Sequence, residues 1–108
     1  MVAFERVGAA NFAVWKFRLK PQSLCTLQIP KGAQILAVQA QRDEPCIWVI
    51  VDPLAPTETR RFRIFGTGHL IETDEPLAYR GTCQLNGGAL VFHVFEIEGN
   101  PAAMAAHS

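Results

Sequence analysis

The stretch Cys46-Ile47-Trp48-Val49-Ile50-Val51 is continuously apolar, and β-branched and aromatic residues dominate it. A short run of this kind is typical of a central strand that is buried on both faces of a sheet. The polar segment Arg42-Asp43-Glu44-Pro45 precedes it and predicts a turn. The segment from Asp52 to Thr57 contains two prolines and predicts a loop. The sequence therefore indicates a β-protein organised around residues 46–51.

The N-terminal side of this run predicts three further strands. Residues 12–19 alternate in part between apolar and polar side chains, and residues 24–29 alternate throughout. Pro30-Lys31-Gly32 then predicts a tight turn, since proline presets one corner and glycine accepts the left-handed conformation. We expect this turn to make a hairpin with a return strand over residues 33–42.

The C-terminal side predicts three more strands. In the first of them Phe62 and Ile64 face one way, while Arg61, Arg63 and Phe65 face the other. The dipeptide Asn-Gly is the strongest short hairpin signal, and it stands between the other two strands. These strands are expected over residues 59–65, 79–85 and 89–97, with a hairpin at Asn86-Gly87, a break at Gly66-Thr67-Gly68, and a loop over 69–78 that has room for a short strand at 70–72.

The pattern predicts an all-β fold of about seven short antiparallel strands in a sandwich or small barrel. We expect a single β domain over residues 11–98, with frayed extensions over 1–10 and 99–108. Residues 1–10 include two charged side chains and have no long apolar core, so they do not resemble a signal peptide or an anchor. No apolar run is long enough to span a membrane.

Composition narrows the class of protein. The 108 residues carry 10 basic and 10 acidic side chains, so the net charge is zero, which argues against bulk binding to nucleic acid or to a membrane surface. Charged residues make up 19% of the chain and hydrophobic residues 49%. Three strands are too apolar for a sheet that has one solvent-exposed face. We therefore expect a homo-oligomer that covers part of the exposed apolar surface. These strands are residues 35–38, 46–51 and 89–95.

The three cysteines, Cys25, Cys46 and Cys83, are an odd number at wide spacing, which is a poor disulfide framework. No CxxC pair is present, so a zinc site is not expected. Each cysteine lies in an apolar or alternating run and is predicted to be a buried free thiol. A reducing cytoplasm fits this usage, and no metal ion or cofactor is expected.

One segment is a candidate binding site because it places guanidinium groups beside a glycine-rich turn. Guanidinium groups bind phosphate in a bidentate manner, and such a turn can aim backbone N–H groups at an anion. The alternative is a solvated strand face in which Arg61 and Arg63 pair with Glu58 or Glu72. No P-loop motif is present. The candidate residues are Arg60, Arg61, Arg63, Gly66, Thr67, Gly68 and His69.

Other constellations are weaker. His93 lies within an apolar strand and is expected to be a satisfied buried or interface histidine, and neither His69 nor His93 has metal-ligand spacing. Aromatic residues on a sheet can stack bases, but few basic residues surround them here, so core and interface packing is the plainer interpretation. These aromatic residues are Trp15, Phe17, Trp48, Phe62 and Tyr79.

Four segments together carry a family resemblance: Ile29 to Gln39, Pro45 to Pro53, Arg61 to His69, and Gly87 to Glu96. They resemble a family of small tailed-bacteriophage and prophage proteins of unknown function, over roughly residues 14–97. The resemblance implies a phage accessory protein in the host bacterial cytoplasm, and it implies no catalytic residue.

The sequence thus predicts a non-enzymatic phage accessory protein that acts by binding. Counter-defence is the expected role, by masking a host defence protein or sequestering an anionic nucleotide signal. The alternative is a structural or assembly component of the phage particle. A small hydrolase that uses His69 or His93 is the third option.

Overall fold

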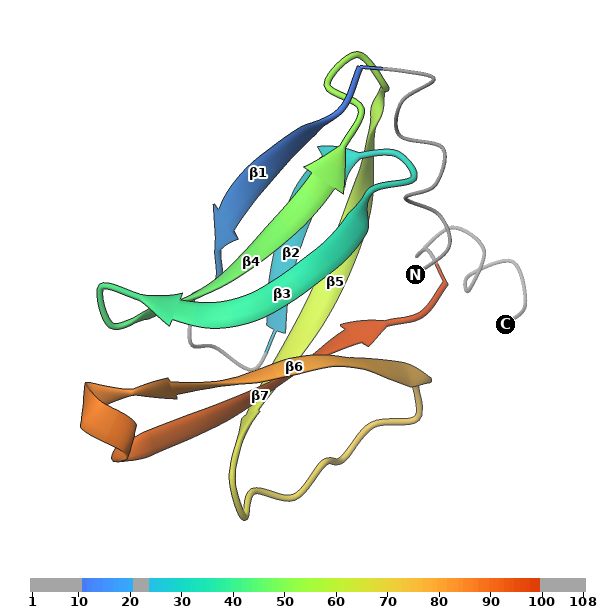
Figure 1. The fold of residues 1–108 in the computed structure, drawn as a ribbon. Helices are drawn as coiled ribbons and strands as arrows, with labels where there is room; N and C mark the ends of the chain where they lie inside the picture. Colours follow the sequence, from blue (N-terminus) through green and yellow to red (C-terminus); the bar gives the residue numbers. More distant parts are fainter. Residues whose placement is uncertain (1–10, 21–23, 100–108) are drawn as a thin grey trace.

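The structure is a computed structural model that describes residues 11–20 and 24–99 (Figure 1). All regular elements in these ranges are strands, apart from one short 3₁₀ turn, Asn86–Gly88 (η2). The prediction of an all-β fold with seven strands is confirmed. Residues 1–10 and 100–108, which make up most of the predicted extensions, lie outside the described residues. The strands are β1 (Ala13–Arg18), β2 (Leu24–Pro30), β3 (Gln34–Gln41), β4 (Glu44–Val51), β5 (Thr57–Gly66), β6 (Leu77–Leu85) and β7 (Leu90–Ile97).

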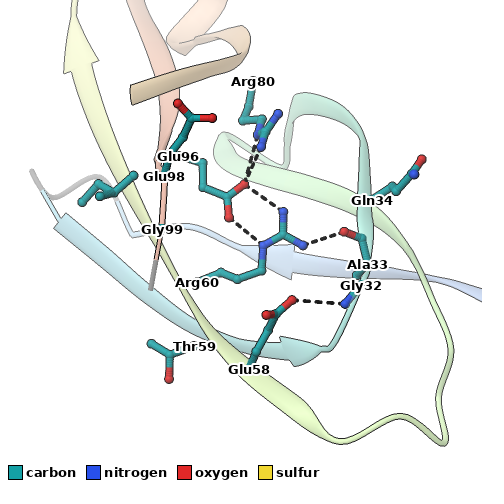
Figure 2. Close-up of a pocket in the computed structure, with 11 residues that line it drawn as sticks. Gly32, Ala33, Gln34, Glu58, Thr59, Arg60, Arg80, Glu96, Glu98 and Gly99 are labelled. Carbon is teal, nitrogen blue, oxygen red and sulfur yellow. Dashed lines mark hydrogen bonds and ion pairs between the residues drawn. The ribbon is translucent and has the colours of Figure 1, made fainter. Parts of the chain in front are cut away.

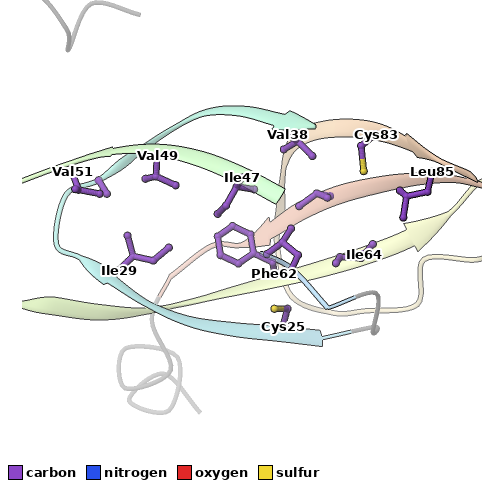
Figure 3. Packing of buried hydrophobic residues seen from close by; sticks show 13 residues of the cluster. Cys25, Ile29, Val38, Ile47, Val49, Val51, Phe62, Ile64, Cys83 and Leu85 are labelled. Carbon is purple, nitrogen blue, oxygen red and sulfur yellow. The ribbon is translucent and has the colours of Figure 1, made fainter. Parts of the chain in front are cut away.

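The strands form two antiparallel sheets that face each other (Figures 1 and 3). The smaller sheet has the order β1-β4-β3 and the larger sheet has the order β2-β5-β7-β6. This is the two-layer arrangement that alternating strands of this length favour, because each sheet buries one apolar face against the other. The predicted short strand at residues 70–72 is absent, and these residues belong to the β5–β6 loop.

The predicted hairpin between β2 and β3 is wrong. The turn itself exists, since the Ala33 N–H donates to the Pro30 carbonyl at 3.2 Å. However, β2 pairs with β5, and β3 pairs with β4 in the other sheet. The Lys31 N–H donates to the Pro56 carbonyl at 2.7 Å, which holds the turn against the chain that leads into β5. The turn therefore carries the chain from one sheet to the other.

Two other turns do make hairpins. Arg42 and Asp43 join β3 to β4, and both have positive φ angles, 51° and 63°. The polar turn is thus shorter than predicted, since Glu44 and Pro45 already belong to β4. The β6–β7 hairpin predicted at Asn86-Gly87 is confirmed, and the positive φ angles of 52° and 65° at these residues explain the choice of Asn and Gly.

The core lies between the inner faces of the two sheets (Figure 3). Ile47 and Val49 of β4 and Phe62 of β5 are fully buried there. β4 is the central strand of its sheet, as predicted, but it is not fully buried on both faces. On its outer face Trp48 and Ile50 are only half-buried, because within the described part of the chain no second layer covers that side.

The two sheets meet closely along one side, where the edge strands β3 and β6 lie against each other. A Cβ atom at Gly81 would lie 2.7 Å from the Val38 Cβ atom, so only glycine permits this approach. Each of these strands also contains an irregularity, β3 at Leu36 and β6 at Arg80. The opposite side, formed by β1 and β2, lacks such a close contact among the described residues.

No helix in the described part of the chain is long and apolar enough to cross a membrane.

Candidate functional site

A hollow of about 520 Å³ lies at one end of the sandwich, where the β2–β3 turn meets parts of three strands (Figure 2). The strands are the start of β5, the bulged part of β6 and the end of β7. Charged and polar side chains line it, in contrast to the apolar core beside it. Its wall is formed by Gly32, Ala33, Gln34, Glu58, Thr59, Arg60, Arg80, Glu96, Ile97, Glu98 and Gly99.

Glu96 is the centre of this site. It lies directly opposite Phe62 in the β5–β7 register and so points to the inner face of the sheet, where it is 7% exposed. A buried carboxylate is costly unless it is paired and hydrogen-bonded. Arg60 supplies the pairing, since its Nε donates to Oε2 at 2.6 Å and its Nη2 donates to Oε1 at 2.8 Å. This two-pronged geometry is the strongest arrangement available to an Arg–carboxylate pair.

Arg80 provides a second guanidinium for the same carboxylate. Its Nε and Nη2 both donate to Oε1 of Glu96, at 3.0 and 2.9 Å. Arg80 is the extra residue in β6, because the register shifts between Tyr79 and Gly81. A bulge re-aims a side chain that regular alternation would send elsewhere. The bulge thus explains how Arg80 reaches the inner side of the sheet.

The cluster also holds the β2–β3 turn in place (Figure 2). The Arg60 Nη1 donates to the Ala33 carbonyl at 2.6 Å. The Gly32 N–H donates to Oε2 of Glu58 at 3.1 Å. The turn that changes sheets is therefore bound to β5 by a charged hydrogen bond on each side.

The charges in the cluster shift one another's pKa values. Burial raises the pKa of Glu96, but hydrogen bonds and positive charge from Arg60, and then from Arg80, outweigh burial, so this pKa lies below its usual value. The pKa of Arg60 is raised, first by its hydrogen bonds to Glu96 against the opposing effect of burial, and further by the charges of Glu96 and Glu58. Both groups are therefore charged at neutral pH.

The structure divides the predicted arginine site between two faces of β5. Arg60 joins the hollow, whereas Arg61 and Arg63 lie on the outer face of the sheet. Arg61 pairs with Glu75 at 3.1 Å, a partner that the sequence did not predict. The Arg63 guanidinium lies over the Phe65 ring, with 5.2 Å from its central carbon to the ring centroid, a cation–π contact.

The glycine-rich turn after β5 uses much of its backbone internally. The Thr67 N–H donates to the Val91 carbonyl at 3.3 Å, and the His69 N–H donates to the Gly66 carbonyl at 3.1 Å. These two N–H groups are therefore not available to an anion. His69 is exposed, and its ring lies against Gly66, where an added Cβ atom would be 2.9 Å from the ring Cε1 atom.

His93 lies on the outer face of β7 between two hydroxyl groups. Its Nε2 is 2.8 Å from the Thr67 hydroxyl oxygen, and its Nδ1 is 2.9 Å from that of Thr82. The Thr82 hydroxyl is also 2.5 Å from the Tyr79 hydroxyl. Both ring nitrogens of His93 are thus satisfied, as predicted from the sequence, but the residue lies on the outer face of the sheet and not in the core.

The aromatic residues do not form one stacking surface. Phe62 is in the core and Phe17 packs against it, whereas Trp48 lies on the outer face of the smaller sheet. Tyr79 contacts Phe95 on the outer face of the larger sheet, with ring centroids 5.5 Å apart. The described residues also include no cluster of metal-ligating side chains.

All three cysteines are buried and free, as predicted. Burial, followed by the neighbouring Cys46, raises the pKa of the Cys83 thiol. A raised pKa keeps this sulfur protonated and unreactive at neutral pH.

A smaller hollow of about 290 Å³ lies at the edge of the other sheet. Arg18 and Glu44 form an ion pair there at 3.2 Å, with side chains 64% and 49% exposed. The Lys16 Nζ donates to the Gln41 amide oxygen at 2.5 Å. Water competes with these contacts, so the ion pair in this hollow contributes less to stability than the buried ion pairs around Glu96.

Glu96 and Arg80 were not among the residues predicted from the sequence, and Arg60 was not separated from its neighbours. Two signals were present. Arg60 shares the parity of Phe62 and Ile64, and Glu96 shares the parity of Val94, so both point into the space between the sheets. When alternation places a positive and a negative side chain between the sheets, the two are expected to form an ion pair, because an unpaired buried charge is costly. No pattern marks Arg80, because a bulge reverses the alternation that would place it.

The fold and the site together define a small two-sheet antiparallel β-sandwich with a charged hollow at one end. A family model described as a domain of unknown function (DUF7352) matches residues 11–103. The chain therefore belongs to the DUF7352 family. No curated protein and no solved structure matches it.

Proposed function

We propose that the chain is a binding protein that acts without catalysis and takes a small ligand with one anionic group in the hollow beside Glu96. The observation that carries this proposal is the state of Arg80. Its side chain is 35% exposed at the hollow, and it uses two nitrogens on a single oxygen of Glu96. Its Nη1 makes no hydrogen bond to any described residue, which leaves a cationic donor for a ligand.

The size of the hollow supports a small molecule. Ligand pockets commonly measure about 300–1,000 Å³, and this hollow is about 520 Å³. Its wall carries Arg60 and Arg80 against Glu58, Glu96 and Glu98, so the local charge is −1. This balance disfavours a polyphosphate. A ligand with one phosphate or carboxylate can bind at Arg80 if it also brings hydrogen-bond donors that offset the excess negative charge of the carboxylates.

The biological role that we propose is counter-defence by a phage accessory protein in the cytoplasm of a host bacterium. The resemblance to phage and prophage proteins supports this role. Sequestering a small anionic signal is the form of counter-defence that the hollow fits best. Masking a host protein is the other form.

The test is a thermal-shift panel on the full chain with nucleoside monophosphates, cyclic dinucleotides, dicarboxylates and inorganic polyphosphate. We expect a monoanionic or dianionic compound to raise the melting temperature of the wild type and to lose most of this effect in Arg80→Gln. The matched control is Arg18→Gln, which removes an equally charged side chain far from the hollow. A ligand that raises the melting temperature equally in all three proteins would exclude this site, and a panel with no effect would remove the support for a small ligand.

The alternative function is a structural or assembly component of the phage particle. The observation in its favour is the outer edge of β2, which no described strand pairs with and which offers backbone hydrogen-bonding groups to another chain. Mass spectrometry of purified virions separates the two proposals. Many copies per particle would favour assembly, and their absence would favour the accessory role.

A further inference from the structure

β2 forms one edge of the larger sheet (Figure 1). It pairs with β5 on one side along its whole length, from Leu24 opposite Arg63 to Pro30 opposite Thr57. On the other side no described strand pairs with it. An edge of this kind presents a row of N–H and C=O groups that can pair with another strand.

Proteins usually protect such edges with charged side chains, bulges or cover, and the other three edge strands of this fold show these devices. β1 carries Lys16 and Arg18. β3 and β6 each contain a register irregularity and lie against each other. β2, with the sequence Leu-Cys-Thr-Leu-Gln-Ile-Pro, has no charged residue and pairs with β5 without a register shift. It is the least protected edge in the described part of the chain, because its only such device is Pro30, which lacks an N–H at the end of the strand.

The surroundings of this edge are apolar. β1 and β2 are the sheet edges on the side away from the β3–β6 contact. Trp15 of β1 points to the inner side, since it pairs with Val49, and it is 39% exposed. Leu24 at the start of β2 is 46% exposed. Each of these two edge strands thus exposes a large apolar side chain.

We infer that β2 pairs antiparallel with β2 of a second copy of this chain, about a two-fold axis at Leu27. This register places Cys25 opposite Ile29 of the partner, Thr26 opposite Gln28, and Leu27 opposite Leu27. These pairs join apolar with apolar and polar with polar side chains, and no two charges of the same sign meet. The end pair sets Leu24 opposite Pro30, which has no N–H to donate, so the backbone pairing rests on residues 25–29. The two four-stranded sheets become one continuous sheet of eight strands, and the interface is isologous.

The pair of strands needs further contacts to be stable. A standard interface buries about 800 Å² on each partner, more than one seven-residue edge supplies. The exposed part of Leu24 supplies apolar area on β2 itself, and Trp15 exposes apolar area on β1, the edge strand of the facing sheet on the same side. The second copy is favoured over an acidic or basic peptide because neither β2 nor these two residues offers a charge to recognise.

The test measures the molar mass of the full chain in solution by light scattering and by sedimentation equilibrium. The wild type is expected at twice the chain mass of 11.9 kDa. A matched pair of variants then tests the register. Thr26→Glu with Gln28→Glu sets a glutamate opposite a glutamate at two positions, and Thr26→Glu with Gln28→Lys sets a glutamate opposite a lysine at the same two.

We expect the variant with two glutamates to dissociate with a dissociation constant at least about tenfold above that of the variant with a glutamate and a lysine. Added salt should narrow this difference, because it screens exposed charges. Both variants lose the hydrogen bond that the Gln28 amide donates to Thr59, and both carry the same Thr26→Glu change beside Arg61, so they differ only in the charge at position 28. Equal circular dichroism spectra and equal melting temperatures check that both variants fold.

A monomeric wild type at all concentrations would overturn the inference, and so would two variants with the same dissociation constant. The variant Arg80→Gln distinguishes a failure of the dimer proposal from a failure of the ligand proposal. It is expected to remain dimeric, because Arg80 lies on β6, at the opposite edge of the same sheet. Loss of the dimer would therefore leave the ligand proposal standing, and the reverse also holds.

Discussion

Phe62 and Glu96 lie directly opposite each other on neighbouring strands, and both point into the space between the two sheets. Phe62 belongs to the apolar part of that space, and Glu96 belongs to the charged end (Figures 2 and 3). The apolar part is stabilised by burial that many residues share. The charged end depends on a few ion pairs that must all be present, because each one compensates the desolvation of the others.

The largest effect is expected in the apolar part. Phe62→Ala removes a fully buried ring and leaves a cavity in the centre of the core. We expect the free energy of unfolding to fall by about 3–5 kcal/mol, measured by chemical denaturation. The control is Phe62→Leu, which keeps most of the volume and should cost much less. Equal losses in the two variants would mean that the core tolerates a cavity at this position.

One substitution at the charged end should lower the free energy of unfolding nearly as much. Glu96→Gln keeps the size of the side chain but removes its charge, so Arg60 stays buried without the carboxylate that pairs with it. We expect a loss of about 3 kcal/mol in the free energy of unfolding. Arg60→Gln should cost a similar amount. The double variant should cost clearly less than the sum of the two single variants, because one interaction is removed in both.

The pH dependence of unfolding tests the same cluster by another route. The pKa of Glu96 is lowered in the folded state, so its ion pairs contribute fully above the unfolded pKa of about 4.3. This contribution is lost as pH falls through the lower folded-state pKa. The stability difference between wild type and Glu96→Gln should therefore be constant near pH 7 and shrink on acidification. A difference that grows in acid would contradict the assigned direction.

An intermediate effect is expected where the two sheets touch. Gly81→Ala adds a Cβ atom 2.7 Å from that of Val38. We expect a loss of about 1–2 kcal/mol, because β3 and β6 must move apart. Val38→Ala removes the Cγ2 methyl, 2.8 Å from the added atom, but keeps the Cβ, so the double variant should recover only part of the stability lost by Gly81→Ala. A fully additive double variant would show that the Cγ2 methyl does not limit the approach of the sheets.

The smallest effect is expected at an exposed ion pair. Arg18 and Glu44 are bonded at 3.2 Å, but both side chains are about half exposed or more. We expect Arg18→Gln to change the free energy of unfolding by less than about 1 kcal/mol, and added salt to reduce even that change. A loss as large as that of Glu96→Gln would mean that burial does not distinguish the two kinds of pair.

The pattern of apolar and polar residues was sufficient to predict the strands, and Asn86-Gly87 predicted the β6–β7 pair, but the sequence did not predict how the strands divide between two sheets. Residues 46–51 predicted the central strand of a sheet because β-branched and aromatic side chains have few alternatives. Pro30-Lys31-Gly32 predicted a reversal of the chain, which is present. A turn sequence does not specify whether the strands on its two sides pair with each other or enter different sheets. That choice depends on β5, which lies far along the sequence.

The candidate site was likewise predictable only where local sequence determines the structure. The arginines near position 60 were a correct starting point, and parity alone separates Arg60 from Arg61 and Arg63. Arg80 was not predictable, because its orientation depends on the bulge that the β6–β7 pairing and the close approach to β3 impose. Its role was decided by tertiary structure and not by local sequence.

The change of sheet between β2 and β3 also has a kinetic consequence. β3 pairs with β4, and β6 with β7, through short turns, so these hairpins can form as soon as their residues are made. β2 must wait for β5, and β1 for β4, because each pairing closes a long loop of chain. During synthesis β2 therefore emerges with both edges unpaired. A neutral strand with two free edges is the segment for which aggregation competes most directly with folding.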